Sequence, residues 1–323
     1  MCGPAANDIW AATFHSACVR ILRRDLERLG LGFTNSFTIY DTDDSRRVIR
    51  DILKDMSLDE KEYQPRSVLA IISNAKDEDL SPEAFAARAR ASRDWRMPKI
   101  AEIYAGYTRR LREANALDFD DIILHTVHLL QQSEEVRGYY QKKFRYVLID
   151  EYQDTNHLQY LLARLLAGGY ENICVVGDDD QSIYRFRGAN IENILSFESQ
   201  YKGCRTIRLE QNYRSTQNIL DAANGVIRNN TGRKGKTLWT DSGRGEPVLI
   251  RTVYNESDEA NFVAGRILER YGRGGAWKDS AVLYRMNAQS NALEMAMKRN
   301  GIPYRIFGGM KFFDRAEVKD MLA

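Results

Sequence analysis

Apolar residues along this chain recur either every three to four positions or in short unbroken runs. The first pattern predicts a helix over residues 15–29, ended by Gly30, and a short apolar run before it predicts a strand over residues 9–14. From about residue 42 to residue 116 only the helical spacing continues. This part of the chain is therefore expected to be entirely helical.

Beyond Asp118 the two patterns alternate. The predicted helices cover residues 119–130, 157–166, 191–197, 216–228, 258–270 and 288–300. The predicted strands cover residues 146–149, 173–176, 204–209, 248–253 and 280–284. Such alternation is typical of parallel sheets covered by helices on both faces, so an α/β fold is expected. A last helical pattern begins near Arg315 and reaches the final residue without a stop signal, so we expect the chain to be truncated there.

Composition excludes several classes of protein. The 323 residues carry 47 basic and 45 acidic side chains, and a net charge of +2 gives no overall attraction to nucleic acid. The longest apolar runs are far shorter than the roughly 20 residues that span a membrane, and residues 1–8 lack the parts of a secretory signal. No C-x-x-C pair is present, and His125 and His128 share a helical face without further ligands, which favours helix packing over metal binding. A cytoplasmic protein without a membrane span is expected.

Two adjacent carboxylates follow the predicted strand over residues 146–149. Asp150 would lie at the carboxyl edge of the sheet, where open α/β folds bind ligands, and is a candidate magnesium ligand. Glu151 points elsewhere and is a candidate for orienting or deprotonating a water molecule. A strand that simply ends in two solvated acids is the alternative for this pair taken alone.

The next predicted strand is followed by the sequence G-D-D-D-Q-S-I-Y-R-F-R-G. Gln181 both donates and accepts hydrogen bonds, which suits a sensor beside a phosphate group. Tyr184 and Phe186 alternate with arginines such as Arg187, a combination that stacks bases and pairs with the phosphates of single-stranded nucleic acid. A loop that packs on the core through its aromatic side chains is the alternative.

Arg214 lies in the segment Q-N-Y-R-S, where a predicted strand turns into a helix. A guanidinium at such a position could reach a transferring phosphate, as arginine fingers do, although a structural salt bridge is the alternative. No segment fits the phosphate-binding pattern G-x-x-x-x-G-K-[ST]. The tripeptide at residues 235–237 ends correctly, but Asn230 stands where the first glycine belongs, and residues 233–236 are predicted to form a basic surface loop.

Taken together, the motifs resemble superfamily 1 DNA helicases of the UvrD/PcrA/Rep group over essentially the whole chain. The matching segments are A-T-F-H-S at residues 12–16, V-L-I-D-E-Y-Q-D-T-N at 147–156, the loop at 177–188, Q-N-Y-R-S at 211–215 and Y-R-M-N-A-Q-S at 284–290. The resemblance implies an α/β fold with two RecA-like parallel-sheet motor domains, both incomplete, and an all-helical insert in the first. The first motor domain would comprise residues 1–34 and 116–206, the insert residues 35–115, and the second motor domain residues 207–323.

The resemblance also implies roles for individual residues. Asp150 would hold Mg²⁺, Glu151 would activate the attacking water, Gln181 and Arg214 would contact the γ-phosphate of ATP, and Tyr213 would stack on the adenine. Residues that match the family's single-stranded DNA contacts are Thr13, Phe14, His15, Tyr184, Phe186 and Arg187. Tryptophan is common in the family where Phe186 stands, and phenylalanine keeps an aromatic face for base stacking.

The implied activity is that of an ATP-dependent 3′–5′ DNA helicase or translocase. It would act on single-stranded DNA and duplex junctions in DNA repair or replication restart, with repair or replication proteins as further partners. The family's phosphate-binding loop and its last motifs do not occur in these 323 residues, so we expect negligible ATP hydrolysis by this chain alone. Two alternatives are a subunit of a helicase-nuclease and a non-motor protein that binds single-stranded DNA or a partner helicase.

Overall fold

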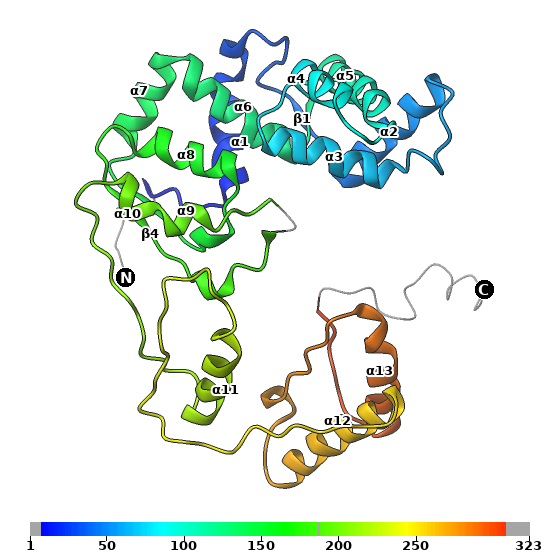
Figure 1. Cartoon of the computed structure of the whole chain (residues 1–323), viewed down its shortest axis with the longest axis vertical. Coiled ribbons are helices and arrows are strands. Elements are labelled where there is room, and N and C mark those ends of the chain that lie inside the picture. Colours follow the sequence, from blue (N-terminus) through cyan, green and yellow to red (C-terminus); the bar gives the residue numbers. More distant parts are fainter. Residues whose placement is uncertain (1–7, 186–187, 308–323) are drawn as a thin grey trace. The chain divides into compact units, whose positions relative to one another are not determined.

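The computed structural model describes residues 8–185 and 188–307. The chain divides into two compact units, Met1–Gly243 and Arg244–Ala323. Figure 1 traces the elements of each unit along the sequence. Within the described ranges no helix is both long and apolar enough to cross a membrane.

One helical layer of the first unit packs around α6. Its helices are α1 (Phe14–Asp25), α6 (Phe119–Gln132), α7 (Glu134–Lys143) and α8 (His157–Ala167), and a 3-10 turn, Leu26–Leu29, extends α1. A capping box sets the start of α6. In it, the side chains of Asp118 and Asp121 each accept a hydrogen bond from the backbone amide of the other residue. The apolar faces of these helices form one core, which includes Leu22, Val127 and Leu158.

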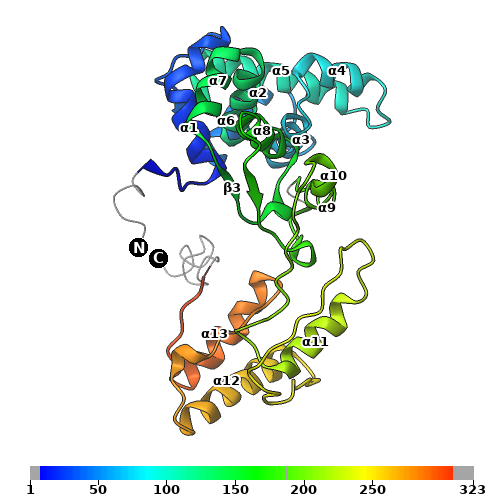
Figure 2. The same ribbon diagram turned by 90° about the vertical axis from the view of Figure 1, so that its left-hand side faces the viewer.

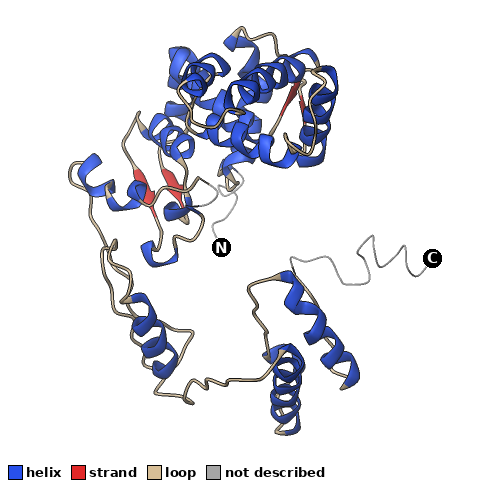
Figure 3. Ribbon diagram, turned by 45° about the vertical axis from the view of Figure 1, so that its right-hand side comes forward, coloured by secondary structure: helices blue, strands red, loops and turns tan. Residues whose placement is uncertain are grey.

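Four further helices form a second core between residues 42 and 113. They are α2 (Thr42–Asp55), α3 (Pro65–Asp77), α4 (Pro82–Arg90) and α5 (Met97–Glu113), and they enclose a separate apolar cluster. The strands β1 (Thr38–Ile39) and β2 (Ala116–Leu117) pair in parallel where the chain enters and leaves this region. Figure 3 shows helices throughout the segment, as its hydrophobic spacing predicted. Its assignment as a separate insert stays a prediction.

A second parallel pair consists of β3 (Val147–Ile149) and β4 (Ile173–Val175), in the register Val147↔Ile173 to Ile149↔Val175. Both strands were predicted, and α8 lies beside β3 (Figure 2). The expectation of a sheet covered on both faces is wrong here, because Leu148 is 75% exposed. Only the face carrying Val147 and Ile149 packs against a core.

The remaining helices also agree with the predicted pattern. The first unit contains α9 (Glu192–Leu195), α10 (Phe197–Gln200) and α11 (Gln217–Ile227). The second unit contains α12 (Glu256–Gly272) and α13 (Ser290–Arg299), which share a small core with Ala264, Met297 and Ile302. The helix expected near Arg315 lies outside the described residues.

Four predicted strands are wrong. Residues 9–13 precede α1 without regular structure, and Thr13 caps that helix, so the strand expected over 9–14 does not form. The segments 204–209, 248–253 and 280–284 also lack strand pairing, and the nearest ladder contact is the isolated bridge Gln211↔Trp239. A strand forms only where a neighbouring strand takes up its backbone hydrogen bonds. Many apolar side chains of these segments, such as Ile207, Ile250 and Leu283, remain exposed.

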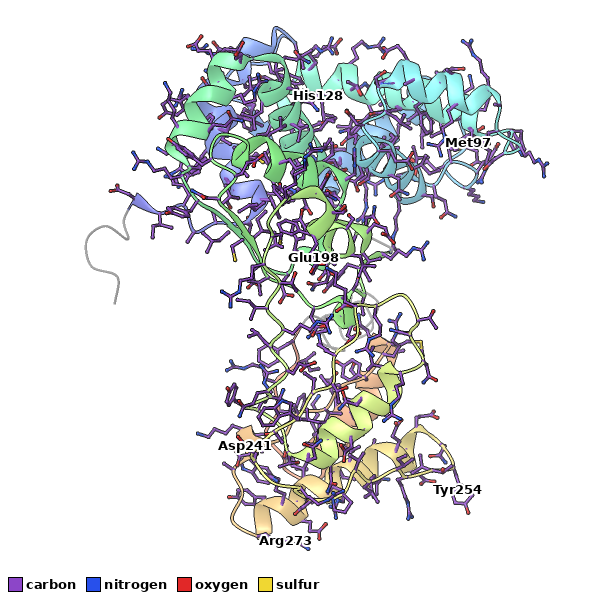
Figure 4. All side chains as sticks on the ribbon, turned by 60° about the vertical axis from the view of Figure 1, so that its left-hand side comes forward. Met97, His128, Glu198, Asp241, Tyr254 and Arg273 are labelled. Atoms are coloured by element: carbon purple, nitrogen blue, oxygen red, sulfur yellow. The ribbon has the colours of Figure 1, made fainter. Side chains whose placement is uncertain are left out.

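The carboxyl end of α3 joins the two helical cores through polar contacts. The Lys76 ammonium lies 2.7 Å from a carboxylate oxygen of Asp118 and 2.7 Å from one of Asp121. Two turns away on the surface, the ring of His128, labelled in Figure 4, lies 2.6 Å from the carboxylate of Asp79. These contacts tie α3 and the residues that follow it to α6.

Asp77 occupies the last position of α3, and its carboxylate accepts a hydrogen bond from Asn156 at 2.8 Å. Burial, together with the nearby charge of Asp120, raises the pKa of Asp77 to about 7. Because the pKa of Asp77 is higher in the folded state than its unfolded value of 3.8, the contribution of its carboxyl group to stability is fully present below pH 3.8. That contribution is lost as the pH rises through the folded-state pKa of about 7.

The free energy of unfolding gained by replacing Asp77 with asparagine should therefore be larger at pH 7.5 than at pH 5. The substitution keeps the acceptor for Asn156 and removes the carboxylate that resists ionisation. We expect a pH-dependent gain of about 1 kcal/mol, smaller than the full linkage value because part of the side chain meets water. Urea denaturation of both proteins at the two pH values measures it, and an equal effect at both would contradict the prediction.

Candidate functional site

The candidate site lies at the carboxyl ends of β3 and β4. The ladder continues beyond both strands, because the amide of Val176 donates to the carbonyl of Ile149 at 2.8 Å and the amide of Tyr152 donates to the carbonyl of Val176 at 2.9 Å. These bonds place Asp150 and Glu151 beside the turn that begins at Gly177. A cavity of about 920 Å³ opens at this edge.

Asp150 and Glu151 both line the cavity with exposed side chains. The Asp150 carboxylate accepts the amide of Glu151 at 2.9 Å. Glu151 has a left-handed backbone (φ 51°, ψ 41°), so the chain turns sharply between the strand and a 3-10 turn, Tyr152–Asp154. A non-glycine residue rarely adopts this conformation outside tight turns and functional sites.

The chemistry of Asp150 fits a magnesium ion. Carboxylate oxygens are the ligands this ion prefers, and it is often held by one or two of them together with water and phosphate oxygens. Among the residues that the structure describes, no cation is paired with Asp150. Its carboxylate is thus free to neutralise an ion at the cavity wall.

Gln181 lines the same cavity from the next turn. It ends the 3-10 turn Asp179–Gln181, and its side-chain amide donates to the Asp178 carboxylate at 2.7 Å. Burial alone would raise the pKa of Asp178, but hydrogen bonds from Lys236 and Gln181 lower it below the ordinary value. The carboxylate of Asp178 therefore stays ionised and holds the Gln181 side chain.

The structure brings residues 233–236 onto this acidic turn, although the sequence predicted only a basic surface loop. The Arg233 guanidinium makes two 2.6 Å hydrogen bonds to Asp180. Lys236 pairs with Asp178, and the backbone amide of Lys234 donates to Asp179 at 2.6 Å. One carboxylate oxygen from each of the three acids lies within 4.8 Å of the other two, and the cations of Arg233 and Lys236 offset the charges of Asp178 and Asp180.

The loop pairing was missed because the partners are 53 to 58 residues apart in sequence. The available signal was the match in charge between D-D-D at residues 178–180 and R-K-G-K at residues 233–236. Lys234 also lies 3.3 Å from Glu198 on α10, which is labelled in Figure 4. Lys234 and Lys236 thus both line the cavity that contains Asp150 and Gln181.

Arg214 and Tyr213 do not line this cavity. The amide of Arg214 donates to the Asn212 side chain at 2.9 Å, and the Arg214 side chain is exposed. Tyr213 is 81% exposed, with its hydroxyl donating to Gln211 at 2.9 Å. Their assignment to the phosphate and the adenine stays a prediction.

The residues expected at DNA differ in their surroundings. Thr13 accepts the amide of Ser16 as the cap of α1, and Phe14 is partly buried against two cores. The His15 ring packs edge-on against Phe119, with centroids 5.5 Å apart. Burial lowers the pKa of His15 despite the opposing charge of Asp120, which favours the neutral ring at pH 7.

The second group expected at DNA is only partly described. Tyr184 is 36% exposed. Phe186 and Arg187 lie outside the described residues. Contact of all six predicted residues with DNA stays a prediction.

Comparison with known proteins identifies the family. Residues 1–202 match the UvrD/REP helicase N-terminal domain, and residues 207–323 match the UvrD-like helicase C-terminal domain. The ATP-dependent DNA helicase PcrA of Staphylococcus aureus is 49% identical over 321 residues, which cover 99% of this chain and 43% of that relative. The helicases of the same name from Bacillus subtilis and Staphylococcus epidermidis are 49% and 48% identical over similar spans. The chain spans less than half the length of these relatives, and it belongs to the UvrD/REP helicase family.

Proposed function

We propose that this chain forms part of an ATP-dependent DNA helicase that moves 3′ to 5′ on single-stranded DNA in DNA repair or replication restart. The observation that carries the proposal is the cavity at the ends of β3 and β4, which Asp150, Glu151 and Gln181 all line. The names of the relatives support ATP as the substrate and DNA as the nucleic acid along which the protein moves.

In this proposal four side chains have defined tasks: three of them line the cavity, and the fourth, Arg214, lies outside its lining. Asp150 would hold Mg²⁺, which supplies positive charge to the phosphates when bound. Glu151 orients the attacking water and accepts its proton. The amide of Gln181 reports the presence of the terminal phosphate, and Arg214 stabilises the charge that develops there.

We also propose two RecA-like motor domains, with residues 1–34 and 116–206 in the first, residues 35–115 as its helical insert, and residues 207–323 in the second. The two family models adjoin between residues 202 and 207, which supports this division. The separate core of α2 to α5 supports the insert. Adenine would stack on Tyr213, and single-stranded DNA would contact Thr13, Phe14, His15, Tyr184, Phe186 and Arg187.

The test is ATP hydrolysis by the full product of the gene that encodes this chain. We expect Mg²⁺-dependent turnover that rises by about 10-fold or more when single-stranded DNA is added, since the bound strand organises the catalytic groups. A duplex with a 3′ overhang should be unwound, and one with a 5′ overhang should not. The chain alone, assayed in parallel, should show negligible turnover.

Two outcomes would contradict the proposal. DNA binding without ATP turnover in the full gene product would favour the non-motor alternative. Release of nucleotides from the DNA would favour a helicase-nuclease subunit. Unwinding from a 5′ overhang would contradict the direction alone.

A further inference from the structure

Gln153 lies buried between the two carboxylate-bearing turns of the site. The residue as a whole is only 1% exposed. The side-chain amide donates to the Glu151 carboxylate at 2.8 Å, and the side-chain oxygen accepts the backbone amide of Asp178 at 2.9 Å. The primary amide of glutamine can serve both partners at once, because one needs a donor and the other an acceptor.

The contact continues from Asp178 to the rest of the site. One carboxylate oxygen of Asp178 accepts a hydrogen bond from the Gln181 side-chain amide at 2.7 Å. The other oxygen is paired with the Lys236 ammonium. Hydrogen bonds thus run without a break from Glu151 through Gln153 and Asp178 to Gln181. The basic loop joins this chain of contacts at Asp178, through Lys236.

Gly177 provides the space that Gln153 occupies. A Cβ atom at position 177 would lie 2.6 Å from the side-chain oxygen of Gln153 and 2.7 Å from Ile194. Any larger residue would displace the Gln153 amide from Asp178. Glycine at position 177 therefore leaves room for the buried side-chain amide of Gln153.

We infer that Gln153 is a positioning residue that locks the Glu151 carboxylate to the turn carrying Gln181, with Lys236 anchoring that turn. The inference rests on the proposed function, in which Glu151 activates water and Gln181 detects the phosphate. Through Gln153 the base and the group that detects the phosphate are held in one arrangement, so that both can act on the same bound nucleotide. Neither the hydrogen-bond donor nor the acceptor of Gln153 needs to touch the nucleotide.

Two substitutions separate this role from simple packing. Gln153→Glu keeps the shape and the acceptor for Asp178, but places a second carboxylate against Glu151 and near Asp154, whose carboxylate is 3.5 Å from the Gln153 amide nitrogen. Two carboxylates this close resist joint ionisation, so the acid limb of the kcat profile should move to higher pH. Gln153→Leu removes both hydrogen bonds and should lower kcat at every pH.

The experiment measures DNA-stimulated ATP hydrolysis by the full gene product between pH 6 and pH 9 for these variants. We expect kcat to fall by about 10- to 100-fold with a KM for ATP that changes less than about 3-fold, because a misplaced base affects the reaction more than binding. Gln141→Leu is the matched control: it loses a 2.8 Å side-chain hydrogen bond to the Leu165 carbonyl away from the cavity. Its kcat and pH profile should match the unsubstituted protein.

Lys236→Met tests the anchor at the other end. It should lower kcat by about 3- to 10-fold, and less than additively when combined with Gln153→Leu, since coupled residues act through one contact path. Fully additive effects would overturn the link between Gln153 and Lys236.

The outcomes distinguish the two proposals. An unsubstituted protein without DNA-stimulated turnover would overturn the proposed function and this inference with it. An active protein in which Gln153→Glu leaves both kcat and the pH profile unchanged would overturn the inference alone. If Gln153→Leu does not fold, Gln153→Glu decides the matter, because it preserves the side-chain shape.

Discussion

Replacing Glu151 with glutamine is expected to lower kcat for DNA-stimulated ATP hydrolysis by about 10²- to 10⁴-fold, the range that a positioned general base contributes. Glutamine keeps the size of the side chain and the left-handed turn at this position, but cannot accept a proton from water. KM for ATP should change little, since the missing interaction acts in the transition state. Steady-state kinetics on the full gene product measure both constants.

Glu171 offers a closely matched control. It lines the same cavity, is exposed, and has a left-handed backbone with φ 54°, but it precedes β4 and so lies at the opposite edge of the parallel pair from Asp150, which follows β3. Glu171→Gln should leave kcat within about 2-fold, the range of ordinary surface changes. Equal losses in the two variants would show that general negative charge in the cavity, and not a base at position 151, governs turnover.

Replacing Lys76 with methionine is expected to reduce the free energy of unfolding by about 3–5 kcal/mol at pH 7.5. Lys76 is 2% exposed and is shared by the carboxylates of Asp118 and Asp121. The Tyr107 hydroxyl donates to Asp118 at 2.8 Å, but carries no charge to replace the ammonium. Without Lys76, two buried carboxylates would face each other unpaired.

The pKa shifts indicate how the loss should depend on pH. Burial works against ionisation of Asp118, but the Lys76 ammonium holds its pKa below the ordinary value. Burial and the Asp118 charge raise the pKa of Asp121 to about 7. In Lys76→Met both acids would take up protons more readily, so the loss should be smaller at pH 5 than at pH 7.5.

Lys99→Met separates burial from ion pairing. Lys99 also lies 2.7 Å from a carboxylate, that of Glu102, but this pair is exposed on α5. Its removal should cost less than about 1 kcal/mol. Urea denaturation followed by circular dichroism compares the variants, and a loss at Lys76 no larger than at Lys99 would contradict the prediction.

Helices were the elements that local pattern predicted well. The helix predicted over residues 119–130 appears as Phe119–Gln132, and the one over 157–166 appears as His157–Ala167. Both begin with a capping box, and the backbone hydrogen bonds in the middle turns of an α-helix are made within the segment itself. Such an element depends on distant residues mainly for the burial of one face.

Strand predictions succeeded only where a partner strand is available. Residues 147–149 and 173–175 pair with each other and were both predicted. Residues 204–209, 248–253 and 280–284 have the same apolar character, yet they do not pair, and Ile250 and Leu283 are each at least 90% exposed. Apolar character alone cannot supply the backbone partners that a strand requires.

The sequence by itself indicated that Asp150 and Glu151 follow one strand and Gln181 the next, and parallel strands end at the same edge of a sheet. The structure added that these two strands are paired. Only the tertiary structure decided how these groups are held. The Gln153 amide between Glu151 and Asp178, and the basic loop on the acidic turn, join residues 25 to 58 positions apart. Hydrogen bonds and charge pairs over such separations depend on where the folded backbone places both partners, and no local pattern of residues records that placement.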